Sequence, residues 1–149
     1  MWQIALTTAA LALAAVTASA GFAPSVADAL RSSSYIYVAT KRHDGNQSKV
    51  VPVWFTYDGD AIYFTTEAGS HKAKRIAKGS PVMVWVGSSQ GPHFVGHGEI
   101  IRDPAQAERM APVYDQKYWI SWLGFFRPRA DRVRDGKTVI VRITPLAGS

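Results

Sequence analysis

The residue types that could hold an anion are concentrated in one short stretch of the sequence. Thr65, Thr66 and Ser70 supply hydroxyl groups, and Lys72 and Arg75 follow with two positive charges. Hydroxyls and cations in this order suit a phosphate group, because hydrogen bonds to an ionised partner are stronger than neutral ones. The stretch therefore predicts a phosphate site.

A strand, a glycine-containing loop and a helix must position these groups. Ser70 is a favourable helix N-cap and Gly79 a favourable stop, which predicts a helix of about two turns between them. Free backbone N–H groups at the start of such a helix add partial positive charge for an anion. Lys49, on a neighbouring predicted strand, is expected to reach the same place. The alternative is a helix with only a solvated basic face, made of Lys72, Lys74, Arg75 and Lys78.

The residue types do not indicate a metal site or a cysteine-based site. The sequence has no cysteine, which excludes disulfides, thiolate metal sites and cysteine nucleophiles. His93 and His97 fall on a predicted strand, where they stand roughly 13 Å apart, too far to share a metal ion. No metal site is therefore predicted, and the catalytic residues stay unidentified. His71, inside the phosphate stretch, is a candidate contact because imidazole can donate a hydrogen bond.

Runs of β-branched and aromatic residues predict that most of the chain forms strands. The turn residues Asp58-Gly59-Asp60 join two of them into a hairpin. The predicted strands are Ser34–Lys41, Lys49–Tyr57, Ala61–Thr66, Pro81–Ser88, His93–Arg102 and Thr138–Thr144, and two further helices are predicted at Pro24–Leu30 and Pro104–Tyr118. The fold class that follows is mainly β with short helices, as a six-stranded antiparallel barrel that is closed or nearly closed.

An unusually aromatic stretch follows the last of these helices. Large aromatic residues are common at subunit interfaces, so the stretch is predicted to form a dimer contact and part of a pocket wall, with the protein core as the alternative. Its members are Tyr118, Trp119, Trp122, Phe125 and Phe126. The next segment, Arg127–Lys137, mixes basic and acidic residues and is predicted to be a solvated loop.

Four motifs follow one another along the chain: Val51-Pro52-Val53-Trp54-Phe55, Asp58-Gly59-Asp60, Tyr63-Phe64-Thr65-Thr66 and Ser70-x-Lys72-x-x-Arg75-Ile76. In this order they resemble the pyridoxamine 5′-phosphate oxidase-like split-barrel family, and the likeness covers roughly Tyr35 to Pro145. Within that family, the sequence is most similar to the flavin- and deazaflavin-dependent oxidoreductases. The resemblance implies a Greek-key split barrel and a homodimer with a flavin-type cofactor at the subunit interface.

The resemblance also implies which residues bind the cofactor. Ser70 and Lys72 match the family's phosphate contacts, and Arg75 matches a basic position used in the deazaflavin branch. Thr65 and Thr66 match the strand end beside the ribityl-phosphate arm. The strand whose backbone follows the isoalloxazine ring is matched by Val51, Pro52, Val53 and Trp54, with Lys49 as a looser match nearby.

The function implied by this resemblance is the oxidation or reduction of a small organic molecule with FMN as the cofactor. In flavin enzymes the ring carries the redox chemistry, so a separate acid–base set is not required. Two alternatives stay open: a reductase that uses the 8-hydroxy-5-deazaflavin coenzyme, and a non-enzymatic carrier of a flavin or of haem. Nucleic acid is not an expected partner, because the strands lack repeated exposed aromatic residues between basic ones.

The length of 149 residues predicts one domain, at residues 21–149, preceded by an apolar segment at residues 1–20. That segment carries no charged side chain and ends in Ala18-Ser19-Ala20, a pattern typical of signal cleavage sites. It predicts an exported or periplasmic protein, or one with membrane contact through the segment. The family resemblance favours the alternative, a cytoplasmic protein. A net charge of +6 independently favours anionic ligands.

Overall fold

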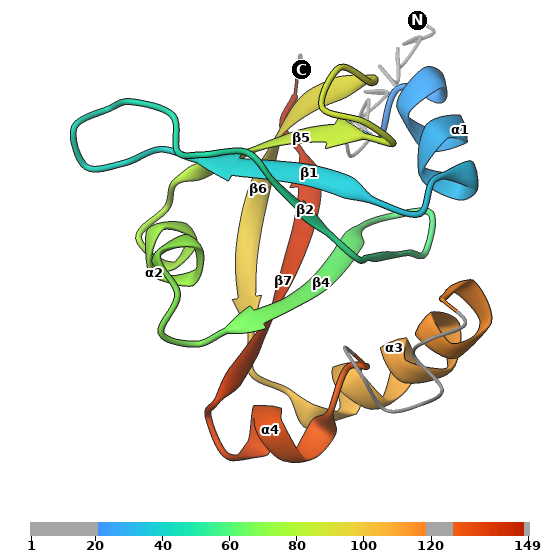
Figure 1. Ribbon diagram of the computed structural model, residues 1–149, viewed down its shortest axis with the longest axis vertical. Helices are drawn as coiled ribbons and strands as arrows, with labels where there is room; N and C mark the ends of the chain where they lie inside the picture. Colours follow the sequence, from blue (N-terminus) through green and yellow to red (C-terminus); the bar gives the residue numbers. More distant parts are fainter. Residues whose placement is uncertain (1–20, 119–126, 148–149) are drawn as a thin grey trace, which may run out of the picture.

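The computed structural model describes residues 21–118 and 127–147 (Figure 1). The apolar segment 1–20 lies outside these ranges, and so do residues 119–126, which include Trp119, Trp122, Phe125 and Phe126 of the aromatic stretch. The predictions made for these residues rest on sequence alone. The helices are α1 (Pro24–Ser32), α2 (His71–Ala77), α3 (Pro104–Lys117) and α4 (Ala130–Arg134). The strands are β1 (Ile36–Thr40), β2 (Val51–Val53), β3 (Thr56–Tyr57), β4 (Ile62–Glu67), β5 (Pro81–Val86), β6 (His93–Ile101) and β7 (Thr138–Pro145). No helix in the described ranges is long and apolar enough to span a bilayer.

The strands form one antiparallel sheet that curls on itself. Its order is β2-β1-β5-β6-β7-β4-β3, so the two edge strands follow one another directly in the chain. Only Trp54 and Phe55 separate them. A sheet whose first and last strands are joined in this way must bend, and Figure 1 shows the resulting half-barrel. The predicted mainly β fold with short helices is confirmed, and the curl is compatible with a split barrel.

The number of strands differs from the six predicted, because the sheet formed by the described residues has seven. The segment Lys49–Tyr57, expected as one strand, is interrupted after Val53. Residues before the break pair with β1, and those after it pair with β4, where Thr56 lies opposite Tyr63. The chain therefore turns at buried Phe55 and changes its partner strand. Residue type does not reveal such a corner, because Val, Trp, Phe and Thr all suit a strand.

Two clusters of buried side chains hold the fold together. The main cluster joins the sheet to α1 and α2, and along β5 its members Val82, Val84 and Val86 alternate with partly exposed residues. This alternation is typical of a strand with one face in the core. The smaller cluster joins α3 and α4 to β7, and its buried members are Ala107, Met110, Tyr114, Tyr118, Val133 and Ile140.

The β3–β4 hairpin has the tight turn that Asp58-Gly59-Asp60 predicted. Asp58 Oδ1 accepts hydrogen bonds from the N–H groups of Asp60 and Ala61, at 2.9 and 2.8 Å, and Gly59 has a φ of +96°. A side-chain oxygen that bonds to the backbone in this way fixes the turn. The segment Arg127–Lys137 is not wholly a loop, contrary to the prediction, because it contains α4. That helix has five residues and a single buried one, too few to produce a periodic apolar pattern.

Candidate functional site

The first candidate site is a pocket of about 330 Å³ formed by the end of β1, the start of β2 and helix α2, here called the basic pocket. It brings together five of the residues predicted from the sequence, which are Lys49, Val51, Ser70, Lys72 and Arg75. Its remaining lining residues, Thr40, Arg42 and Ser48, were not predicted. The fold thus brings Lys49 and Val51 into one pocket with residues of α2 that lie far from them in the sequence.

Positive charge dominates the basic pocket. Arg42, Lys49, Lys72 and Arg75 line it, no acidic residue does, and none of the four forms an ion pair within the described part of the chain. Lys72 is half-buried, with Nζ 5.5 Å from the centroid of the Phe64 ring, and this burial lowers the pKa of its ammonium group. A desolvated cation without a counter-ion is unfavourable, so the pocket is electrostatically prepared for an anion.

The hydroxyl groups of the site are organised by the start of α2. Ser70 is its N-cap, as predicted, and Ser70 Oγ accepts a hydrogen bond from the N–H of Ala73 at 3.1 Å. Thr66 Oγ1 lies 3.2 Å from Ser70 Oγ, so Thr66 reaches the pocket through Ser70 rather than lining it. Because Ser70 Oγ already accepts one bond, its own proton is available to Thr66 or to a ligand.

Close packing of α2 on the sheet fixes the position of Lys72 and Arg75. Gly98 on β6 faces Ile76 of the helix, and a Cβ at Gly98 would lie 2.8 Å from methyl groups of both Ile76 and Val82. The missing side chain therefore lets the helix approach the strand. At the other end of α2, Gly79 has a φ of +93° and closes the helix, as the sequence predicted.

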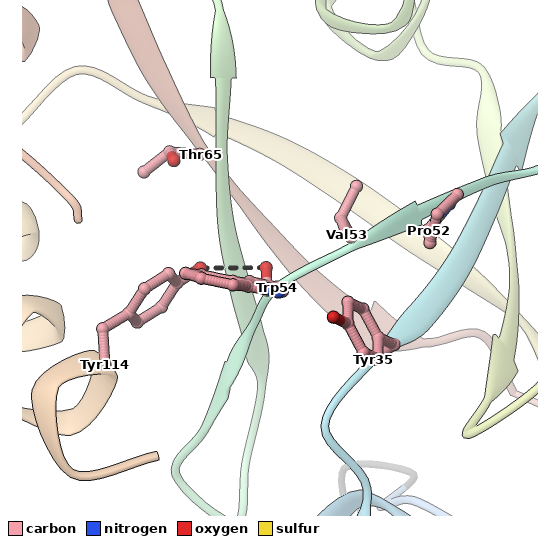
Figure 2. A pocket seen from close by; sticks show the side chains of 6 residues that line it. All are labelled: Tyr35, Pro52, Val53, Trp54, Thr65 and Tyr114. Carbon is pink, nitrogen blue, oxygen red and sulfur yellow. Dashed lines mark hydrogen bonds between the residues drawn. The ribbon is translucent and has the colours of Figure 1, made fainter. Parts of the chain in front are cut away.

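The second candidate site is a pocket of about 360 Å³, here called the aromatic pocket (Figure 2). Four predicted residues line it: Pro52, Val53, Trp54 and Thr65. Tyr35 and Tyr114 also line it. Figure 2 shows Tyr35 and Tyr114 on opposite sides of Trp54, with Thr65 on the neighbouring strand β4. The pocket thus has flat apolar walls and a few polar groups, a composition typical of sites for ring-containing ligands.

Two tyrosines hold Trp54 in place: Tyr114, which belongs to α3, and Tyr118, which directly follows the helix. The Tyr118 ring stacks on Trp54 with centroids 4.2 Å apart and planes 3° apart, and Tyr114 donates a hydrogen bond to Trp54 O at 2.8 Å. Tyr118 also donates to Ser34 O at 2.6 Å. Burial raises the pKa of Tyr114 well above its ordinary value and that of Tyr118 to about 12. Both phenols therefore stay protonated at neutral pH and act as hydrogen-bond donors that support the wall.

The two pockets adjoin the same pair of strands. Along β2, Val51 lines the basic pocket and Pro52 lines the aromatic pocket. At the end of β4, Thr65 lines the aromatic pocket while Thr66 bonds to Ser70 of the basic pocket. The residues predicted as one continuous site therefore divide between two neighbouring pockets.

His71 lines neither of them. It lines an adjoining hollow of about 420 Å³ together with Lys74 and Lys78, and this hollow shares Arg42 and Arg75 with the basic pocket. The contact between His71 and a phosphate stays a prediction. Within the described residues, no three His, Asp or Glu side chains are grouped so that they could hold a metal ion.

Sequence reasoning missed the residues that reach these pockets from distant segments. Arg42 lies in a loop whose basic and polar residues look like ordinary solvated surface, and Tyr35 precedes a strand without belonging to a motif. Only Tyr114 carried a usable signal, because it continues the buried face of α3 after Ala107 and Met110.

Comparison with known proteins places this geometry in a family. The sequence profile described as pyridoxamine 5′-phosphate oxidase matches residues 22–149. The chain belongs to the pyridoxamine 5′-phosphate oxidase family, as its motifs indicated. None of the curated proteins matches the sequence.

Solved structures with the same fold are similar at low identity. An F420 reductase is 24% identical, with a TM-score of 0.54 over 80% of this chain and 92% of the other. General Stress Protein 26 from Bacillus anthracis is 18% identical, with a TM-score of 0.59 over 81% and 86% of the two chains. The FAD and heme binding protein from Mycobacterium smegmatis is 18% identical, with a TM-score of 0.60 over 83% and 66%. At these identities the likeness shows the fold.

Proposed function

We propose that the chain is a flavin-dependent oxidoreductase that binds the phosphate of FMN in the basic pocket and the flavin ring in the aromatic pocket. The observation that carries the proposal is the half-buried Lys72, one of four cations that line the basic pocket and form no ion pair with any described residue. A phosphate supplies the missing negative charge, and it accepts charge-assisted hydrogen bonds worth about 1.5–3 kcal/mol each.

The residues that would hold the cofactor follow from the lining of the two pockets. Lys49, Ser70, Lys72 and Arg75 would bind the phosphate, and Thr66 would orient the Ser70 hydroxyl. Val51 connects this end to the ring end along β2, where Pro52, Val53, Trp54 and Thr65 would line the ring. When bound, a flavin supplies the hydride chemistry, while the protein positions it and excludes water. The substrate would be a small organic molecule.

A second candidate is a reductase that uses the 8-hydroxy-5-deazaflavin coenzyme. The similar structure named F420 reductase favours it, since F420 is a coenzyme of this kind, and Arg75 lies in the basic pocket where the deazaflavin branch has a basic residue. A carrier without turnover is the third candidate, favoured by the similarity to a protein that binds FAD and heme.

A homodimer is part of the proposal. Tyr35 is 42% exposed and Pro52 is also exposed, and both line the aromatic pocket. A second copy placed over them would cover the apolar surface and enclose the cofactor ring.

Export, or contact with a membrane through residues 1–20, is a further proposal that rests on the sequence. Cleavage after Ala20 would leave Gly21 as the first residue.

The visible spectrum of the reconstituted protein tests the proposed function. The full chain, stripped of any bound cofactor, is incubated separately with FMN, the deazaflavin coenzyme and haem, and excess ligand is removed by gel filtration. We expect the FMN spectrum to be retained in stoichiometric amount. Retention of the deazaflavin spectrum instead would select the second candidate, and retention of the haem spectrum alone would select the third as a haem carrier. Bound FMN that no nicotinamide donor reduces would select a flavin carrier, and a colourless protein in every case would contradict all three.

A further inference from the structure

A separate pocket, here called the Lys117 pocket, shares no described residue with the basic or the aromatic pocket. It measures about 330 Å³ and lies between the end of α1, β3 and the last turn of α3. Its lining includes two cations, Arg31 and Lys117, and several hydroxyl groups. The volume falls in the range that suits a small metabolite.

Lys117 is held in an unusual way for a lysine. Its side chain is half-buried, with Nζ 3.2 Å from the centroid of the Phe55 ring, and it donates a hydrogen bond to Phe55 O at 3.1 Å. Burial lowers the pKa of this amine to about 8. The bond to Phe55 uses one of the three N–H groups of the ammonium form, so the nitrogen is anchored and still has groups to offer the pocket.

No carboxylate in the described residues neutralises this amine. The charged and titratable groups near it are Arg31 from α1 and Tyr57 from β3, which line the pocket, and Tyr118, whose ring centroid is 5.3 Å from Nζ. Asp115, on the same helix, forms its ion pair with Arg127 at 3.0 Å. The neutral, nucleophilic form of Lys117 is therefore more accessible than that of an exposed lysine.

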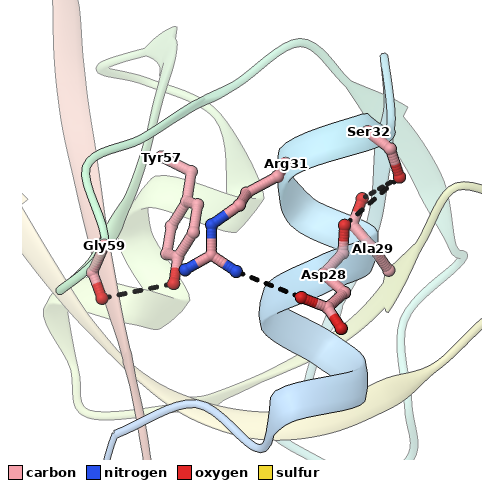
Figure 3. A network of polar contacts seen from close by, with 6 residues as sticks. All are labelled: Asp28, Ala29, Arg31, Ser32, Tyr57 and Gly59. Atoms are coloured by element: carbon pink, nitrogen blue, oxygen red, sulfur yellow. Dashed lines mark hydrogen bonds and ion pairs between the residues drawn. The ribbon is translucent and has the colours of Figure 1, made fainter.

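Arg31 and the hydroxyl groups supply the complementary polar contacts. Figure 3 shows Arg31 reaching from α1 to the Tyr57 ring, with the guanidinium carbon 5.8 Å from the ring centroid and Nη1 3.2 Å from Asp28. That ion pair is exposed on both sides and therefore weak, so a bound acid can compete with it. The lining hydroxyls of Ser33, Ser34 and Thr56 make no hydrogen bond to any described residue.

We propose that the Lys117 pocket binds a small carbonyl compound that carries an acidic group, a 2-oxo acid being the simplest, and that Lys117 forms a reversible imine with it. The lone pair of the neutral Nζ adds to the carbonyl carbon, the C=O bond breaks as the C=N bond forms, and the carbonyl oxygen leaves as water with the two hydrogens of the amine. Nothing is oxidised or reduced in this step. Arg31 binds the acidic group, and the hydroxyls orient the rest of the molecule.

Reductive trapping with pyruvate tests the proposal on the full chain. The protein is incubated with limiting pyruvate and cyanoborohydride near neutral pH, and the labelled lysine is located by peptide mass spectrometry. We expect Lys117 to be labelled at least about tenfold faster than Lys74, an exposed lysine of α2, because burial lowers the pKa of the Lys117 amine and the Lys117 pocket holds the acid beside it. Labelling of Lys117 at or below the rate of Lys74 would overturn the proposal.

Two matched controls separate binding from simple reactivity. Methyl pyruvate has the same reacting carbonyl without the charge, so it should label Lys117 more slowly than pyruvate does. The Arg31→Met variant should lose this preference and leave the labelling by methyl pyruvate unchanged. Equal labelling by the two probes in the wild type, or an unchanged preference in the variant, would show that the pocket does not recognise an acid.

Discussion

The amine of Lys117 couples the stability of the fold to pH. Its pKa of about 8 in the folded protein lies below the ordinary lysine value of 10.5, so between these values the unfolded chain binds more protons than the folded one. The free energy of unfolding contributed by this group therefore rises with pH across that window. Tyr118 acts in the opposite direction only at higher pH, because its pKa is raised from 10.0 to about 12.

Replacing Lys117 with methionine should remove this dependence. We expect the free energy of unfolding of the wild type, relative to Lys117→Met, to increase between about pH 8 and pH 10, because the cost of burying the ammonium group is relieved as it deprotonates. Urea denaturation at several pH values measures the difference. Lys74→Met, on the exposed face of α2, serves as the control and should show no comparable trend. A pH-independent difference for Lys117→Met would contradict the assignment.

The hydroxyl of Tyr114 should matter for stability more than that of Tyr35. Tyr114→Phe removes the partly buried hydrogen bond to Trp54 O and should lower the free energy of unfolding by about 0.5–1.5 kcal/mol. Tyr35→Phe changes an exposed hydroxyl with no bond to a described residue and should have an effect within about 0.5 kcal/mol. Denaturant titrations of both variants decide the point, and equal losses would mean that the Tyr114 bond does not support the aromatic pocket.

Residues of the candidate site could be assigned to one pocket from the sequence where they lie close together along the chain. Lys72 and Arg75 follow the cap residue Ser70 in the short helix α2 and are themselves one turn apart, so their shared pocket could be expected from spacing. Arg42 and Tyr35 reach the pockets through the pairing of β1 with β2 and β5, which is a long-range property that spacing does not encode.

Among the elements, the contact between α2 and β6 gives the sharpest test of packing. Gly98→Ala would place a Cβ 2.8 Å from methyl groups of Ile76 and Val82, so we expect a loss of about 1–3 kcal/mol in the free energy of unfolding. Gly69→Ala is the matched control, because a Cβ there meets nothing within 4 Å, and its effect should stay within about 0.5 kcal/mol. The two variants are compared by chemical denaturation. A Gly98→Ala protein as stable as the control would show that the helix can shift away.

The elements themselves could be predicted to different degrees. The β3–β4 hairpin and the two ends of α2 depend on local turn and cap residues, which the sequence displays directly. The corner at Phe55 and the short helix α4 depend on which distant surface each segment packs against. The residue types at the corner favour a strand throughout, and α4 has too few apolar residues to show a period.

At the scale of the whole molecule, the proposed homodimer can be tested through its exposed apolar residues. Tyr35→Glu should shift the chain towards the monomer, since it places a charge at the rim of the aromatic pocket. Val113→Glu introduces the same charge at an equally exposed position outside that pocket and should leave the dimer intact. Light scattering at micromolar concentration reports the mass. A monomeric wild type that retains cofactor would contradict the proposed assembly.

The affinity for FMN tests most directly whether the basic pocket binds the phosphate of a flavin cofactor. Fluorescence titration is carried out with the wild type, the Ser70→Ala/Lys72→Ala double variant and the control Lys74→Ala, which removes the same charge from α2 outside the basic pocket. Each lost contact should weaken FMN binding roughly 10- to 150-fold, at about 1.5–3 kcal/mol each. Lys74→Ala should bind like the wild type. Riboflavin, which lacks the phosphate, should bind weakly to all three proteins and hardly distinguish them. Equal affinity of the wild type and the double variant for FMN would contradict the account.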